Sequence, residues 1–298
     1  MPRVIDIHDE TSCTIDECVD ALDTLQFDVR DEEKLISGAR WLRRLGNNRT
    51  FLGDLLLDQL QGARNDAATD SAYTPQSLVL SGYRPGYFLR ANIWPAANDP
   101  VYRASGAGTF AYGMAHDHNF DFLTLGYHGP GYASDYWEYD YGAVIGLPGE
   151  RAGLRYTGRR VLHPGTILHY RAHQDVHAQW PPESLSISIN LMATDPGQGW
   201  HDQYGFDPAS DTITGVLSPN STDAFLRLAV AMGHDEAADY AAHVGRTHPS
   251  DRLRLASFEA RAELALDAAQ SQAVWSEAER CGSLLVTRIA GERLKGLA

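Results

Sequence analysis

The chain has 298 residues, and its 25 Lys+Arg against 39 Asp+Glu give a formal net charge of −14. This length allows one large domain or two ordinary ones, and an apolar share of 43% is typical of a globular protein with a core. The acidic balance argues against nucleic acid and anionic membranes as partners, because clustered Lys and Arg supply most of the affinity for both.

The N-terminal residues carry no sign of export. Residues 1–13 are polar and acidic, without the basic start and apolar run of a secretory signal, and no stretch reaches the roughly 18–20 apolar residues that cross a bilayer. The three cysteines, Cys13, Cys18 and Cys281, are few and odd in number, which fits reduced thiols. We therefore expect a cytoplasmic protein, in which small-apolar packing is favoured over a metal or redox pair of Cys13 and Cys18.

Residues 1–75 are predicted to form an N-terminal helical segment. Apolar residues recur at spacings of three and four, which predicts helices over residues 14–25, 33–45 and 51–60. Thr14 is the candidate cap of the first helix, and Gly46 is expected to end the second. Residues 64–75 are polar and aperiodic, which predicts a linker or loop.

Residues 76–208 have the pattern of a β-domain. Gly, Pro, Tyr and Trp become dense and the apolar spacing falls to two, which predicts many short strands in a sandwich or barrel. The clearest strand is 184–191, where Ser and Asn alternate with apolar residues, so that its polar face would line the interior or face water. Further strands are predicted over residues 88–94, 122–127 and 132–141.

Helices return in the C-terminal segment, residues 209–298. Candidate caps, a Gly after one helix and a Pro before another predict four helices, over residues 224–232, 235–244, 251–269 and 273–291. No internal repeat has a clean period. We expect this segment to cover one side of the barrel or to form a homodimer contact.

Histidines gather in the middle segment, where seven of the twelve lie between residues 116 and 177. His116 and His118 are two residues apart, so in a strand both rings would project from one face and could reach one metal ion. Residues 164–177 read PGTILHYRAHQDVH and end at a further candidate, His177. The sequence therefore predicts a metal site in the β-domain.

This pair of segments resembles the two motifs of the cupin superfamily. The first motif of that family contributes His-x-His from one strand, and the second contributes a histidine from a later antiparallel strand that follows a glycine and a turn. The resemblance implies His116, His118 and His177 as metal ligands and Gly165 as the second-motif glycine.

The resemblance also implies the fold class. It covers about residues 76–208, under half of the chain, and implies an α+β protein with a cupin-like barrel, a double-stranded β-helix or jelly-roll. On this prediction the metal site lies in the barrel, between the helical segments of residues 1–75 and 209–298.

The chain departs from the usual motif at one position. Cupin first motifs commonly carry a glutamate four or five residues after the second histidine, where this chain has Phe122 and Leu123. Asp121 and Glu138 are the remaining carboxylate candidates, although strand parity would turn Asp121 away. Three neutral imidazoles leave open metal positions for substrate and O₂. This pattern resembles the thiol dioxygenases, non-haem iron enzymes that also show His-Asp-His.

The resemblance implies a mononuclear Fe(II)-dependent oxygenase that acts with O₂ on a small molecule, amino-acid-like, thiol or aromatic. Zn, Mn, Cu and Ni are the alternative metals, with Mn²⁺ disfavoured by the lack of carboxylates. Two other functions stay open. One is a redox-neutral cupin isomerase, lyase or hydrolase with the metal as Lewis acid, and the other is a non-catalytic ligand-binding cupin.

Three further residues are candidate catalytic residues. Arg90 lies in a predicted strand before the first motif, where the resemblance implies an arginine for a substrate carboxylate, although a surface ion pair fits equally well. Tyr136 belongs to an aromatic hairpin that packs in the core or lines the pocket. His173 could stand at the pocket mouth. No cysteine lies in residues 76–208, which argues against a Cys–Tyr crosslink.

Overall fold

The structure is a computed structural model that describes residues 1–61, 72–74 and 76–297. None of the described helices combines the length and apolarity needed to cross a membrane. The chain divides into two compact units. The first comprises Met1–Tyr141, Arg151–Pro196 and Gly205–Thr212, and the second comprises Gly142–Glu150, Gly197–Tyr204 and Ile213–Ala298. The three-segment division expected from the sequence stays a prediction.

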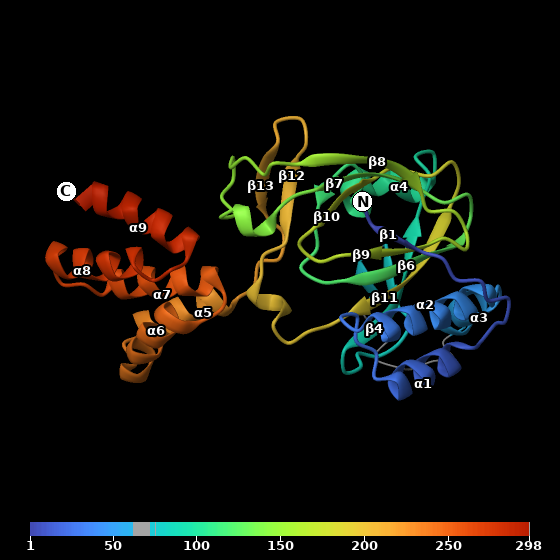
Figure 1. The fold of residues 1–298 in the computed structure, drawn as a ribbon, viewed down its shortest axis with the longest axis horizontal. Coiled ribbons are helices and arrows are strands. Elements are labelled where there is room, and N and C mark those ends of the chain that lie inside the picture. Colours follow the sequence, from blue (N-terminus) through green and yellow to red (C-terminus); the bar gives the residue numbers. More distant parts are fainter. Residues whose placement is uncertain (62–71, 75, 298) are drawn as a thin grey trace. The chain divides into compact units, whose positions relative to one another are not determined.

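Two antiparallel sheets contain the described strands (Figure 1). The first has the order β1 (Arg3–Ile5), β9 (Ile167–Tyr170), β6 (Phe122–His128), β11 (Ser186–Ala193), β4 (Tyr87–Trp94), β3 (Ser77–Val79) and β2 (Ala72–Thr74). The second has the order β13 (Thr212–Val216), β12 (Tyr204–Asp207), β5 (Ala115–His116), β10 (Asp175–Gln179), β7 (Ala133–Glu138) and β8 (Arg155–Val161). With the helices described below, the sheets confirm the predicted α+β class.

The four strands predicted by residue range are present, as β4, β6, β7 and β11.

The alternation in 184–191 left open whether the polar face of this strand lines the interior or faces water, and strand β11 decides between the two. Its polar side chains are buried: Ser186 is 1%, Ser188 0% and Asn190 2% exposed. Its apolar side chains Ile189 and Leu191 are also 0% exposed. Both faces of this strand are covered, and the polar face is turned to the interior.

Three helices cover the outer face of the first sheet, α1 (Ile15–Leu25), α2 (Glu32–Asn47) and α3 (Phe51–Leu60) (Figure 1). Thr14 caps α1 in a capping box with Glu17, as its sequence position predicted. Cys13 and Cys18 are free and packed in the core beneath these helices. The apolar side chains of β11, β6 and β4 form the other half of this core.

The prediction that Gly46 ends the second helix is wrong, because α2 continues to Asn47. Gly46 lies against the side chain of Leu125 on β6, so that a Cβ at this position would collide with the leucine. The glycine therefore allows close approach of the helix to the sheet, a role that a helix-stop pattern does not reveal.

Other short elements lie outside the sheets. A short helix, α4 (Pro100–Ser105), begins at Asp99, whose side chain accepts the N–H of Val101. Among the described residues, 3₁₀ helices span Ala107–Phe110, Tyr141–Ala143 and Gln198–Trp200. The predicted linker 64–75 lies outside the described residues except for 72–74, which form β2.

The second unit contains five helices among its described residues, α5 (Thr222–Ala231), α6 (Asp235–Thr247), α7 (Asp251–Glu263), α8 (Ala268–Glu279) and α9 (Leu284–Leu297). The predicted boundaries after residue 251 are wrong, because three helices replace two. Asp267 begins α8 by accepting the N–H of Gln270, and Gly282 turns the chain toward α9 with a φ of +86°. The Ala-rich pattern hid these boundaries, since it continues across the breaks.

Candidate metal centre

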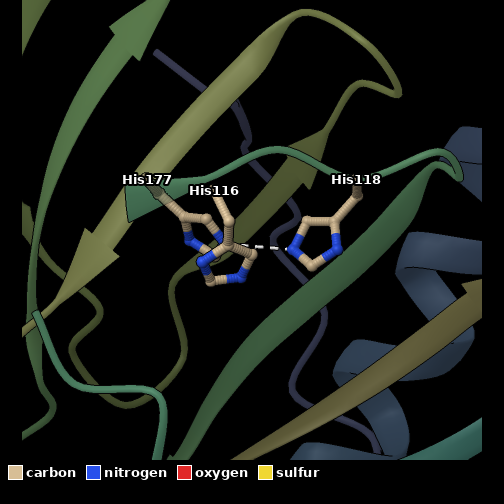
Figure 2. A group of neighbouring side chains, drawn as sticks. All are labelled: His116, His118 and His177. Carbon is tan, nitrogen blue, oxygen red and sulfur yellow. Dashed lines mark hydrogen bonds between the residues drawn. The ribbon is translucent and has the colours of Figure 1, made fainter. Parts of the chain in front are cut away.

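Three histidines from two neighbouring strands of the second sheet and the loop after one of them meet at one point (Figure 2). His116 ends β5, His118 follows two residues later, and His177 lies in the middle of β10. The two strands are antiparallel neighbours, and their register places His177 opposite His116. The three side chains are buried. The fold thus brings together the three residues that the sequence singled out as metal ligands.

The ring nitrogens are close enough to share one ion. One nitrogen of each ring lies within 4.8 Å of those of the other two, and His118 Nε2 is 3.0 Å from His177 Nε2. His116 Nδ1 is 2.9 Å from the carbonyl oxygen of Met114; a carbonyl only accepts, so Nδ1 carries the proton and Nε2 keeps its lone pair. Metal–nitrogen bonds of about 2.0–2.1 Å place such nitrogens roughly 3–3.5 Å apart. Small side-chain movements would reach that geometry.

The strand predicted for the His-x-His segment includes only the first histidine. Strand β5 ends at His116, and His118 lies in the following loop, where its carbonyl oxygen accepts the backbone N–H of His173 at 2.8 Å. Asp117 between them is fully buried, and its carboxylate accepts the Tyr139 hydroxyl at 2.5 Å. The loop therefore keeps both imidazoles directed to one point after the strand has ended.

Burial keeps the three imidazoles neutral. It lowers the pKa of His116, and it lowers the pKa values of His118 and His177 well below their usual range. Neighbouring imidazoles and the charge of Arg90 act in the same direction on these two rings. A neutral imidazole has the free lone pair that a metal ligand needs, so the donor set fits a cation.

A cavity of about 220 Å³ opens beside the histidines. It is smaller than the roughly 300–1,000 Å³ typical of sites for drug-sized ligands. Both sheets contribute to its wall, which is lined by Gln76, Ser77, Arg90, Asn92, Trp94, Ala111, His116, His118, Phe122, Tyr132, Tyr170, His177, Gln179 and Asn190. The cavity has room for a small molecule next to the cluster.

The three other predicted site residues have different positions. Arg90 on β4 lines the cavity. Tyr136 on β7 lies behind the wall, where its hydroxyl is 2.9 Å from that of Tyr170, a lining residue. His173 occupies the turn before β10 with a φ of +58°, and its ring lies 4.2 Å from that of Tyr141. Their catalytic roles stay predictions.

No carboxylate joins the three histidines among the described residues. Asp121 lies 2.9 Å from His169 Nε2, and Glu138 is bound by Arg155 at 2.6 Å. Phe122, at one of the positions where the usual glutamate would stand, packs edge-on against His118 with ring centres 4.9 Å apart. The candidate centre therefore offers only imidazole donors from the protein.

Gln179 is a site residue that the sequence analysis missed. Its Nε2 is 2.9 Å from His177 Nδ1, and in this arrangement His177 Nε2–H donates to His118 Nε2. Binding of one cation by both Nε2 atoms requires the other tautomer of His177, which Gln179 supports if its amide turns and Oε1 accepts Nδ1–H. The available signal was its spacing, since Gln179 follows His177 by two residues on one strand and shares its face.

We expect Gln179→Leu to weaken metal binding by about 10–100-fold, the range typical when the outer hydrogen-bond partner of a ligating histidine is removed. Chelator competition on the purified protein measures the affinity. Gln174→Leu, in the turn before β10, is the matched control and should bind metal like the wild type. Equal affinities in the two variants would contradict an orienting role for Gln179.

Comparison with known proteins adds little to this picture. No protein-family model matches the sequence, and no curated protein matches it. One solved structure that it resembles is a protein of Ralstonia eutropha JMP134, provisionally described as a mannose-6-phosphate isomerase. The two are 16% identical over 41% of this chain and 88% of that chain, with a TM-score of 0.24. A likeness at this level carries no argument, so the conclusions below depend on this chain's own residues.

Proposed function

We propose that the chain is a metal-dependent enzyme of the cupin type, in which His116, His118 and His177 hold one ion and the adjoining cavity takes a small molecule. The observation that carries this proposal is the convergence of three buried, neutral imidazoles beside a cavity. Three buried imidazoles that converge in this way are better explained as ligands of a first-row metal than as packing residues of the core.

The strand order supports the cupin-type barrel. From β4 to β11 the chain alternates between the sheets, except that β7 and β8 are neighbours in one sheet. The eight strands from β4 to β11 lie in the order β9-β6-β11-β4 in one sheet and β5-β10-β7-β8 in the other. This order is the one expected of eight strands wound in a jelly roll, and it supports the proposed barrel.

An imidazole-only donor set suits iron, zinc, copper and nickel, and we propose iron as the ion. A bound ion would supply Lewis acidity, and iron would also supply redox chemistry with O₂. We therefore propose oxygenation of a small molecule as the leading reaction. The imidazole-only set supports it, because three ligands leave room on the ion for both reactants.

The chain's own side chains position the substrate and exclude water. Arg90 places a positive charge in the cavity and is proposed to hold an anionic group. Trp94 stacks on Tyr132 with ring centres 4.0 Å apart, and Phe122 stacks on Tyr170 at 4.5 Å. These rings form a rigid wall that limits the size of the substrate.

A redox-neutral isomerase or lyase is the second candidate, and Tyr170 favours it. Its phenol lines the cavity, and burial raises its pKa well above the usual range, so that it stays protonated. Tyr136 holds the hydroxyl from behind at 2.9 Å. A phenol that stays protonated can donate a hydrogen bond to a substrate oxygen, which would assist a redox-neutral reaction.

Metal analysis followed by oxygen uptake tests the proposal. Protein loaded anaerobically with Fe(II), and separately with Zn(II), should retain about one ion per chain. The iron form should consume O₂ when small thiols, amino acids or aromatic acids are added. If both the iron and the zinc forms convert a substrate without consuming O₂, the oxygenase proposal is wrong and the redox-neutral reaction takes its place. No retained metal under replete conditions would exclude both.

A further inference from the structure

The wall opposite the histidines carries a pair of polar residues from neighbouring strands. Asn190 on β11 and Arg90 on β4 are register partners, so their side chains leave the sheet on the same face. Both line the cavity that contains the three histidines. A molecule that contacts the metal ligands therefore lies within the same space as this pair.

Asn190 has an unusual hydrogen-bonding state. Its side chain is 2% exposed, and its Nδ2 group has no hydrogen-bond partner among the described residues. Buried polar groups in native proteins are nearly always paired, because an unpaired donor loses its bonds to water without replacement. A donor left unpaired beside a cavity points to an acceptor on a ligand.

The charge of the cavity indicates what kind of acceptor this is. The chain as a whole has a net charge of −14, but the residues described as lining the cavity include a cation, Arg90, and no carboxylate. Asn92 lies on the same strand as Arg90, and its Oδ1 already accepts the Ser77 hydroxyl at 2.8 Å. The side-chain amide of Asn92 can therefore offer its N–H groups to a ligand. The wall opposite the histidines thus favours an anion that accepts hydrogen bonds, whereas an unpaired acceptor among the described lining residues, Gln179 Oε1, comes from the histidine strand β10.

On the basis of the function proposed above, we infer that Asn190 is a substrate-binding residue that donates its Nδ2–H to a carboxylate, beside the charge of Arg90. The substrate is then a small carboxylic acid whose other end faces the three histidines. Asn190 contributes the directed hydrogen bond and Arg90 contributes the charge, so both affinity and orientation depend on the pair.

Two pairs of probes test the preference for a carboxylate. Acetate is compared with acetamide, and benzoate with benzamide, by isothermal titration calorimetry and by Trp fluorescence, since Trp94 lines the cavity. Each pair is matched in size and differs in charge. In at least one pair the carboxylate should bind the wild type at least tenfold more tightly than its amide. Equal affinity in both pairs, or no binding by either carboxylate, overturns the inference.

Asn190→Asp, which keeps the shape but replaces the donor by an acceptor, should lose at least tenfold in carboxylate affinity while amide affinity changes little. Asn190→Ala is the second variant if the first does not fold. Ser186→Ala is the control, because Ser186 shares the face of β11 but its hydroxyl accepts the N–H of Gly131 at 3.1 Å and it does not line the cavity. Unchanged carboxylate affinity in the folded Asn190 variant also overturns the inference.

Titrations with and without bound Zn(II) separate this inference from the proposed function. The protein could fail to retain metal after loading and still bind carboxylates in a way that depends on Asn190. This result would support the anion subsite and contradict the proposed metal enzyme. Metal retention without any carboxylate preference would leave the proposed function standing and overturn the subsite.

Discussion

His118→Ala should remove most of the metal affinity of the protein. His118 is buried and its Nε2 lies 3.0 Å from His177 Nε2, so the substitution takes away one of three converging donors. Loss of a direct ligand should exceed the 10–100-fold loss typical of an outer partner, so we expect at least about a hundredfold weaker binding. Elemental analysis after metal loading should give about one ion per chain for the wild type and a small fraction of this for the variant.

A stability measurement provides the second readout for this variant. A ligand that binds only the folded state adds about 2.7 kcal/mol to the free energy of unfolding at a hundred times its Kd. Zn(II) should therefore stabilise the wild type and fail to stabilise His118→Ala at the same concentration. His128→Ala, at the exposed end of β6, is the matched control and should behave as the wild type. Unchanged metal content in His118→Ala would show that the three histidines are not the ligands.

Leu125→Ala should cause a large loss of stability without involving the metal directly. Leu125 is 1% exposed and fills the space beside Gly46, where α2 approaches β6. Truncation of a buried leucine to alanine costs about 2–5 kcal/mol, because apolar burial is lost and a cavity remains. Chemical denaturation of the metal-free protein, followed by Trp fluorescence, measures the change in the free energy of unfolding.

Leu57→Ala is the matched control for this prediction. Leu57 belongs to α3 in the same helical layer, but it is 53% exposed, so its truncation should change the free energy of unfolding by less than about 0.5 kcal/mol. A loss below 1 kcal/mol in Leu125→Ala would mean that the helices do not form a tight core with the sheet.

The positions of the three histidines could be predicted because their signal is local. His-x-His fixes a shared direction over two residues, whereas His177 was expected as a ligand from the motif resemblance. The pairing of β5 with β10 then depends only on the barrel topology that the motif resemblance implies. The ending of β5 at His116 was not predictable, because Asp117 is held by Tyr139, which lies far along the chain.

Other features depend on contacts between distant segments, and the sequence did not reveal them. Ser186 and Ser188 have the composition of a solvent-facing surface, but they lie inside because α1–α3 cover the apolar face of β11. In the sequence, Gly46 has the pattern of a residue that ends a helix, and its packing against Leu125 is visible only in the structure. The aromatic hairpin expected around Tyr136 is wrong, because β6 and β7, the strands on either side of the Gly-Pro-Gly turn, belong to different sheets. Only the structure shows that the Tyr136 hydroxyl meets that of Tyr170.

The two covered faces of β11 have a practical consequence for redesign. Positions 186, 188 and 190 belong to the interior polar face, whereas 189 and 191 pack in the helix–sheet core. Position 190 lines the cavity, so a substitution library at this position would change the wall beside the candidate centre while keeping the helical layer in place. Ligand preference can therefore be varied on this strand without truncating the side chains that pack against the helices.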